Sequence, residues 1–592
     1  MATPCFLLPH RITRLASAAA LIGLVGCDAA SPGDSDTAPA DPESAPAHQP
    51  EQEEAASPAD EAAGPQADCA TNDGEGSDLP CAEGISITQI DINQGVAVTL
   101  LDNGEWVPGN GLPQDDDLED NRVASVVGNR PGIVVAAWDT DGDWSAREIT
   151  ARLVLSGGGV DEVYLDTKNV SGSSDNDMSN LDATFNWNVD AEHLVTGVKM
   201  TVDLREADSG EDGSDQANRF PDEPESLRIP DNPMTLEVTV VPITNTDPRC
   251  SGSTPPATDE PYLENYRKIL QQFNPVSEVK IHAYDGPAVE SNVDEECWFG
   301  TTETTGVLYH AYMARVDAEV HANHVYFAVA DLCGDGGTNS NPCQSAGGMA
   351  WNWGFVAAAA WWDNGNLPDF YSWRYHQAVH EIGHAQGRAH SPGGGAGDPD
   401  PNYPNADGSL DTWGYGILDD SVHTGTGDKR FDYMSYEYSN SWSSLYTWEK
   451  NARYIAAYQN WDRGMFSDIE LARHADFGNA DKRAALRKTD TMLMGITQPD
   501  GGVVWRAIEG AYEPEASNSE RTFQFKTRDG RSINSPAWET TMDGKDSLQY
   551  VVARMPEELQ DISDIVDLGG GSRSASRLRV SVEDVHRYRP NR

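Results

Sequence analysis

The segment 375–392, "YHQAVHEIGHAQGRAHSP", contains four histidines, one glutamate and two glycines. On a helix, His380 and His384 are four residues apart, so they lie on one face and one turn apart. This spacing allows two imidazoles to reach one zinc ion at the usual bond length of about 2.0–2.1 Å. The alternative is an ordinary polar helix face that carries surface histidines.

The residues that follow can supply a third ligand. Gly387 can adopt the left-handed conformation that ends a helix and turns the chain back, and His390 follows three residues later. Three protein ligands leave one coordination position open, which is typical of a catalytic zinc site and not of a structural one. Glu381 points about 100° away from the two ligands. Its carboxylate can therefore approach a metal-bound water and act as a general base.

Other histidines receive structural interpretations. His376 lies four residues before His380. We expect it to pack between helices or to support a ligand, because a fourth protein ligand would close the site to water. His321 and His324, in "HANH", have no companion ligands nearby in the sequence, so we expect no metal there.

The full run "HEIGHAQGRAH" follows the pattern HExxHxxGxxH and resembles the metzincin zinc endopeptidases. Those enzymes also carry a methionine turn beneath the metal, and "FDYMSYEY" matches it with Met434. The resemblance implies that Tyr436, two positions later, contacts the zinc or stabilises an oxyanion. Both residues could instead belong to an ordinary core. The segments "NYPNADGSLDTWGYGI" and "SWSSLYTWEK" are further similar to bacterial secreted metalloproteases, some of them lipoproteins related to mucin-cleaving enzymes.

The resemblance implies hydrolysis of peptide bonds in extracellular proteins or glycoproteins. Zinc lowers the pKa of its water to about 7, Glu381 takes the proton and passes it to the leaving amine, and Tyr436 helps to polarise the carbonyl. Two alternatives remain. One is a non-catalytic surface binding or adhesion protein on a metalloprotease fold, against which the intact Glu381 argues. The other is a zinc hydrolase that acts on a non-peptide bond.

An acidic, glycine-rich stretch follows His390. Its candidate oxygen ligands are Asp398, Asp400, Asn402, Asp407 and Asp411. Hard oxygens of this kind suit calcium. A solvated acidic loop without an ion is equally compatible with the pattern, so Ca²⁺ stays a second candidate cofactor beside Zn²⁺.

The formal net charge of −55 is extreme for 592 residues. Such a chain repels nucleic acid and anionic lipid surfaces, so we expect neither as a partner. The expected partners are protein or glycoprotein substrates, and we expect a monomer, although the sequence does not determine the oligomeric state.

Residues 1–26 are predicted to be an export signal. "HRITR" is basic and "LASAAALIGLVG" is apolar but too short to span a bilayer. "LVGC" resembles the lipobox of bacterial lipoproteins, which implies lipidation of Cys27; a plain signal peptide with a chance cysteine is the alternative. We therefore expect a protein anchored to the cell envelope by its N-terminal lipid, more readily at the outer membrane or cell surface, or released. Six further cysteines are available for disulfides in that oxidising compartment.

The rest of the chain divides by composition. Residues 27–84 are rich in Ala, Pro, Ser, Asp and Glu and are predicted to be a disordered acidic tether. Short strand-like runs with turns between them predict a β-sandwich domain over 85–248. Mixed helix and strand patterns predict an α/β, metzincin-like catalytic domain over 255–472, and strand-like runs return in a β-rich domain over 478–592. The expected fold is multidomain, with β-sandwich-like domains flanking the catalytic one.

Overall fold

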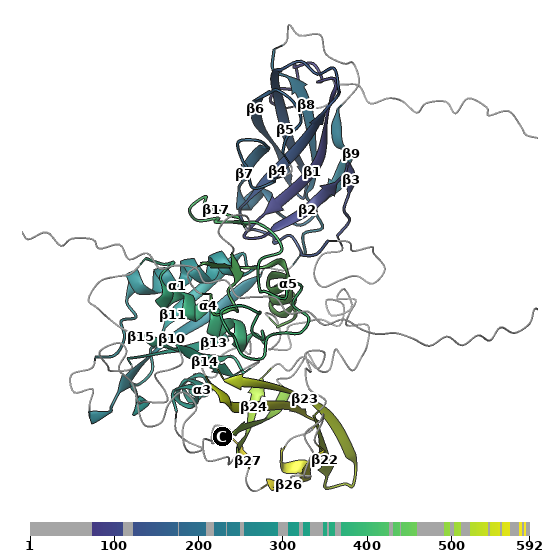
Figure 1. Cartoon of the computed structure of the whole chain (residues 1–592). Helices are drawn as coiled ribbons and strands as arrows, with labels where there is room; N and C mark the ends of the chain where they lie inside the picture. Colours follow the sequence, from purple (N-terminus) through teal and green to yellow (C-terminus); the bar gives the residue numbers. More distant parts are fainter. Residues whose placement is uncertain are drawn as a thin grey trace, which may run out of the picture. The chain divides into compact units, whose positions relative to one another are not determined.

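The computed structural model divides the chain into two compact units, 1–64 and 65–592, and every described residue belongs to the second. The described residues are 74–109, 122–175, 177–208, 218–231, 234–248, 254–293, 306–318, 324–331, 347–351, 354–361, 369–424, 430–437, 440–458, 490–497, 503–510, 521–542, 545–556, 559–568, 579–582 and 585–587. The predicted signal peptide, Cys27 and the tether up to residue 73 lie outside these ranges. The described chain is rich in β-structure and contains several sheets (Figure 1).

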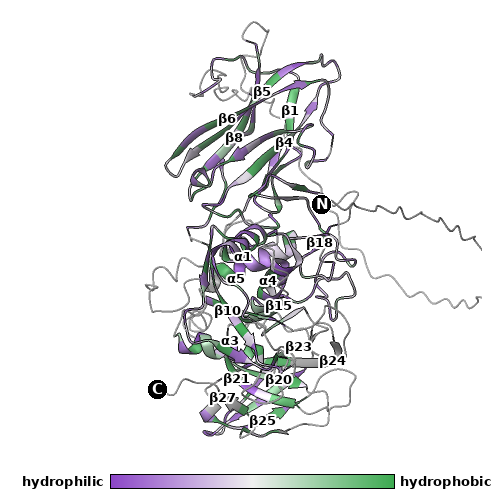
Figure 2. Ribbon diagram, turned by 90° about the vertical axis from the view of Figure 1, so that its left-hand side faces the viewer, coloured by the Kyte–Doolittle hydropathy of each residue, from purple (hydrophilic) through white to green (hydrophobic). Residues whose placement is uncertain are grey.

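Two antiparallel sheets make up the part that follows the tether. The first has the order β3-β2-β1-β4-β7, with β1 (Ile85–Asn93), β2 (Ala97–Asp102), β3 (Glu105–Trp106), β4 (Gly132–Thr140) and β7 (Phe185–Val189). The second has the order β6-β5-β8-β9, with β5 (Arg147–Gly157), β6 (Val160–Val170), β8 (Lys199–Glu206) and β9 (Arg219–Ser226). Polar and apolar residues both occur along β4, β5 and β8 (Figure 2), and the apolar ones share one core.

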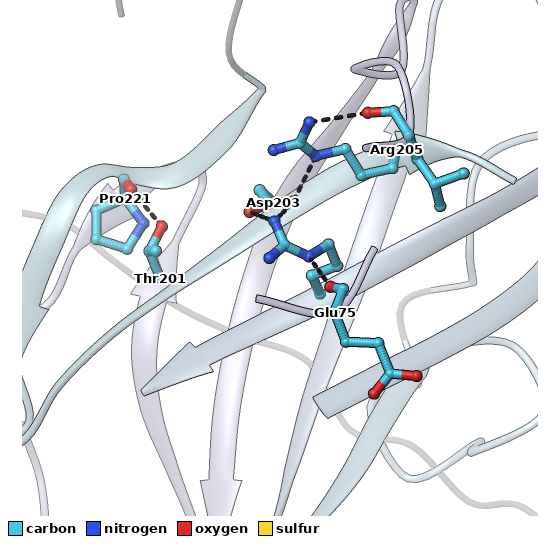
Figure 3. A network of polar contacts seen from close by, with 7 residues as sticks. Glu75, Thr201, Asp203, Arg205 and Pro221 are labelled. Carbon is cyan, nitrogen blue, oxygen red and sulfur yellow. Dashed lines mark hydrogen bonds and ion pairs between the residues drawn. The ribbon is translucent and has the colours of Figure 1, made fainter. Parts of the chain in front are cut away.

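The predicted tether is too long at its C-terminal end. Residues 74–82 pack on the sheet that contains β5 and β8, where Arg152 and Asp203 form a buried ion pair of 2.8 Å. Arg152 also donates to the carbonyl of Glu75 at 2.7 Å, and Arg205 bonds to Asp203 at 2.9 Å (Figure 3). Cys81 is buried there and forms a disulfide bond. The backbone carbonyls of this segment thus satisfy buried guanidinium groups, and this ties the segment to the sheet.

The next sheet carries the helix with the histidines. Its order is β11-β10-β13-β15-β14, with β12 also paired to β10. Its strands are β10 (Thr235–Asn245), β11 (Glu278–Ala283), β12 (Val289–Ser291), β13 (His324–Asp331), β14 (Gly348–Trp351) and β15 (Val356–Trp361). All neighbours are parallel except β14, which is antiparallel to β15. Among the described strands, β10 pairs only with strands of this sheet, although it lies before residue 248, within the predicted N-terminal domain.

Helices cover both faces of this sheet. They are α1 (Glu260–Phe273), α3 (Val307–Asp317) and α4 (Trp373–Ala385). Tyr266 of α1 contacts Phe327 of β13, whereas Arg315 of α3 donates to the carbonyl of His324. Side chains alternate along a strand. Phe327 therefore lies on the face of the sheet that α1 and α4 cover, and His324 and Tyr326 lie on the opposite face, which α3 covers.

After α4 the chain forms short paired strands and one more helix. They are β16 (Gly414–Tyr415), β17 (Val422–His423), β18 (Phe431–Asp432), β19 (Ser441–Trp442) and α5 (Leu445–Tyr458). None of the helices in the described ranges is long and apolar enough to cross a membrane.

An eight-stranded sheet closes the chain, in the order β26-β25-β22-β23-β24-β20-β21-β27. Its strands are β20 (Asp490–Thr497), β21 (Val503–Gly510), β22 (Thr522–Thr527), β23 (Ser532–Met542), β24 (Lys545–Met555), β25 (Ile562–Asp567), β26 (Arg579–Val580) and β27 (Val585–Arg587). Met492, Met494 and Ile496 of β20 join the main core, whereas Leu493 belongs to a separate cluster. The predicted β-rich segment after residue 478 is therefore a sheet with two apolar faces.

Arg130 joins the first part of the chain to the helix α1. Its guanidinium is fully buried and donates to the carbonyls of Gln271, Gln272 and Val276 at 2.7, 3.3 and 2.8 Å. A cation at the C-terminal end of a helix also interacts favourably with the helix dipole. Arg130 therefore satisfies carbonyls that would otherwise be buried without donors.

The substitution Arg130→Ala should destabilise the fold strongly. Each carbonyl left without a donor costs roughly 1–3 kcal/mol, so we expect the free energy of unfolding to fall by about 3 kcal/mol or more. Urea denaturation followed by tryptophan fluorescence measures this. Arg531→Ala is the control, since Arg531 forms an exposed ion pair with Asp529, and surface pairs of this kind contribute little to stability. Equal unfolding midpoints for the two variants would contradict the role of Arg130.

Candidate metal centre

The helix α4 ends at the glycine that the sequence indicated. Gly387 has φ of 85°. Its N–H donates to the carbonyl of His384 at 2.8 Å, and the N–H of Arg388 donates to that of Gly383 at 2.9 Å. These two bonds form a Schellman motif, in which a left-handed glycine reverses the chain direction. The reversal brings His390 back towards the helix.

The structure brings His380, His384 and His390 together as a buried group whose ligand atoms all lie within 4.8 Å of one another. The Nε2 atoms of His384 and His390 are 3.2 Å apart. Two nitrogens bound to one tetrahedral zinc at about 2.0–2.1 Å are separated by about 3.3 Å. The observed separation therefore matches that of two ligands of one ion.

The other ring nitrogen of each histidine faces a backbone carbonyl. His380 Nδ1 lies 2.8 Å from the carbonyl of Tyr433, His384 Nδ1 lies 2.6 Å from that of Arg388, and His390 Nδ1 lies 2.8 Å from that of Gly397. A carbonyl only accepts, so each Nδ1 carries the proton and each Nε2 carries a lone pair.

Three converging lone pairs form a set of donors that a metal cation can occupy. Without one, the Nε2 atoms of His384 and His390 face each other as two acceptors, which is electrostatically unfavourable. A zinc ion bound here would be held by these Nε2 atoms, and the Nδ1–H bonds to carbonyls are the outer-shell partners that metal-bound histidines usually have. These residues therefore fit zinc, with one coordination position left for water.

Glu381 follows the first ligand on α4 and is buried against the edge strand β14. A Cβ atom added to Gly348 would lie 2.6 Å from both Cγ and Oε1 of Glu381. Only a glycine at position 348 therefore leaves room for this carboxylate. The pairing of Gly348 with Ala359 places it on the face that α4 covers, so strand and helix together determine where the carboxylate lies.

The turn at Met434 lies under the helix. A Cβ atom added to Gly383 would lie 2.5 Å from the Met434 sulfur, and Met434 is fully buried. Its N–H donates to Oδ1 of Asp432 at 2.8 Å, and its carbonyl accepts from the N–H of Ser391 at 3.1 Å. Burial raises the pKa of Asp432, against the lowering effect of its hydrogen bonds with Ser444 and Met434. The turn is thus tied both to α4 and to the chain beside His390.

Two further predicted residues lie near the histidines. The ring of Tyr436 is half-buried, with its centroid 5.0 Å from that of His390 and 6.1 Å from that of His380. The ring of His376 is tilted against that of Phe273, with centroids 5.0 Å apart, and it bonds to the Ser441 hydroxyl. It is therefore a packing residue, as expected, and burial lowers its pKa to about 4.

Neither of the two groups of metal-ligating His, Cys or carboxylate side chains found among the described residues includes a residue of 398–411. Asp400 accepts from the Tyr446 hydroxyl at 2.7 Å and from the Lys450 ammonium at 3.0 Å. Burial acts to raise the pKa of Asp400, but Lys450 and the hydrogen bonds outweigh it and hold the pKa below its usual value. Asp411 accepts from the N–H of Leu445. Asp400 and Asp411 thus fasten the loop to α5, and calcium binding stays a prediction.

His324 has companion ligands in space that the sequence does not reveal. Glu237, His282 and His324 form a second described group of metal-ligating side chains, drawn from β10, β11 and β13. The three residues lie far apart in the sequence. Only the register of the parallel strands, which pairs Glu237 with His324 and Thr239 with His282, reveals the group. His321 lies outside the described residues.

Comparison with known proteins adds no relative. No protein-family model matches the chain, and no curated protein matches it.

Removal of one imidazole should weaken metal binding. His390→Ala leaves two nitrogen ligands. Loss of an outer-shell partner lowers metal affinity by roughly 10–100-fold, and we expect loss of a ligand to lower the zinc affinity by more than that. Competition with a chromophoric chelator measures this affinity. His376→Gln is the control and should keep the wild-type affinity, although it lies on the same helix. Equal affinities of wild type and His390→Ala would remove His390 from the ligand set.

Proposed function

We propose that this chain is a zinc-dependent endopeptidase of the metzincin type. One observation carries the proposal: three buried imidazoles converge through lone-pair-bearing Nε2 atoms, and a buried carboxylate follows the first of them on the same helix. In this proposal the sheet β10–β15 with α1, α3 and α4 is the α/β catalytic domain. His380, His384 and His390 hold the ion.

The chemistry proposed for the site divides between the ion and the chain. Zinc, when bound, lowers the pKa of a coordinated water to about 7 and polarises a carbonyl. Glu381 accepts the proton of the attacking water and delivers it to the leaving amine as a general base and then a general acid. Tyr436 lies beside two ligand rings, where its hydroxyl can donate to the developing oxyanion. Met434 positions α4 and takes no part in the reaction.

A peptide is the substrate class that best suits the surroundings of Glu381. Among the described strands, β14 is the last of its sheet, and it is antiparallel to β15. An extended chain can add to such an edge through backbone hydrogen bonds, with little regard to its side chains. The four residues of β14 are buried, so a peptide would have to displace what covers this edge before it pairs there. The Glu381 carboxylate lies against Gly348 of that same strand. A peptide paired with β14 would therefore run past the general base.

We further propose that the protein is exported and is anchored through Cys27. This part rests on the sequence of the first 27 residues alone, which lie outside the described ranges. The expected substrates are then extracellular proteins or glycoproteins. The alternative is a non-catalytic binding protein with the same metal group.

Glu381→Gln should abolish peptide cleavage and keep the metal. The amide has nearly the same shape as the carboxylate but cannot take a proton, so we expect kcat to fall by at least about 10²-fold. Cleavage of a peptide library, with and without chelator, and zinc content by mass spectrometry measure the two properties. Cleavage by this variant at the wild-type rate would overturn the assigned base. Zinc-loaded wild type that cleaves no peptide would favour the non-catalytic alternative.

Gly348→Ala should impair catalysis without removing zinc. The new methyl group would overlap the Glu381 side chain and the carbonyl of Ala358, each 2.6 Å away. Displacement of the base by about 1 Å is expected to lower kcat on the order of 100-fold. The control is Gly142→Ala, because a Cβ atom there meets nothing within 4 Å. Unchanged kcat in both variants would show that Gly348 does not position Glu381.

A further inference from the structure

A second group of metal-ligating side chains lies on the opposite face of the central sheet from α4. Glu237 and His324 are paired across β10 and β13, and His282 is paired with Thr239 of β10. Side chains at paired positions, and at alternate positions of one strand, share a face. We propose that Glu237, His282 and His324 form a second site for a divalent transition metal, with zinc as the ion of this class.

The distances place the three donors around one point. Oε1 of Glu237 lies 3.0 Å from Nε2 of His282 and 4.0 Å from Nδ1 of His324. All three ligand atoms lie within 4.8 Å of one another. Ligands of one tetrahedral zinc are about 3.3 Å apart. Small rotations close this gap, because the side chains of His282 and Glu237 are 47% and 33% exposed.

His324 is oriented for this role. Its Nε2 lies 2.8 Å from the Thr239 hydroxyl. When Nε2–H donates to that hydroxyl, Nδ1 carries the lone pair and faces Glu237. The Arg315 guanidinium also binds the backbone carbonyl of His324 at 3.0 Å. The most buried of the three ligands is therefore held by neighbours, as metal-bound histidines usually are.

The donor set selects the class of ion. Two imidazoles and one carboxylate suit zinc, copper, nickel or cobalt, whereas calcium and magnesium prefer oxygen ligands only. Three protein ligands leave a position for water. The site would link β10, β11 and β13, and its greater exposure to solvent makes its metal affinity lower than that of the buried group on α4. It does not depend on the proposed peptidase activity.

Metal counting on the full chain tests the proposal. Metal-free protein is loaded with zinc alone, in the presence of excess calcium to occupy the many surface carboxylates, and the ions retained after buffer exchange are counted. We expect two zinc ions for wild type, one for His282→Ala, one for His390→Ala and none for the double variant. His193→Ala, which removes a histidine that is outside both groups and lies near acidic side chains, should keep two.

The variants separate this proposal from the peptidase proposal. Because His282 is half-exposed, His282→Ala should fold normally and keep peptide cleavage, and Glu237→Gln should lose the same ion. Loss of one zinc in His282→Ala together with an inactive wild type would support this site and contradict the peptidase. A wild-type protein that binds one zinc, lost only in His390→Ala, would overturn the second site. Two ions in both His282→Ala and Glu237→Gln would overturn it as well.

Discussion

The candidate metal centre depends on three hydrogen bonds from imidazole Nδ1–H groups to backbone carbonyls. The carbonyls of Tyr433, Arg388 and Gly397 each fix one ring in the tautomer that presents Nε2 as a lone pair. Without these acceptors the rings could rotate, and either nitrogen could carry the proton. Since the acceptors belong to the backbone, substitution of side chains cannot remove them directly. Only a change in the path of the chain would disturb the ligand geometry.

The rest of the fold holds that path in place. The segment between His390 and the turn at Met434 passes along the first sheet. There the side-chain amide of Asn93 donates to the carbonyl of Trp413 at 3.0 Å. Beyond the turn, the Trp442 indole donates to the carbonyl of Gly95 at 2.6 Å. The chain on both sides of the methionine turn is therefore tied to the N-terminal strands. This gives the sandwich a structural task that its own sequence does not suggest, namely to support the loop that orients His380.

Sequence spacing could predict the first metal group because its ligands lie on one helix and one turn, where the geometry is local. His380, His384 and His390 are determined by helical periodicity and by one left-handed glycine. The second group could not be found in this way, because Glu237, His282 and His324 meet only through the register of three parallel strands. The sheet to which β10 belongs is also set by strand pairing between distant segments. Its alternating residues fit an antiparallel sandwich as well as a sheet between helices, so the sequence placed β10 in the N-terminal domain. The acidic loop is ambiguous for another reason, since carboxylates can serve a neighbouring lysine or the backbone, as Asp400 and Asp411 do, as readily as they serve an ion.

The most direct test is the coordination of zinc in the protein itself. A crystal structure with anomalous data at the zinc absorption edge would locate the ion without reference to activity. The account predicts a peak at about 2.0–2.1 Å from Nε2 of each of His380, His384 and His390, with a water in the remaining position. A peak bound through Nδ1 of any of the three, or the absence of zinc between them after loading, would contradict it.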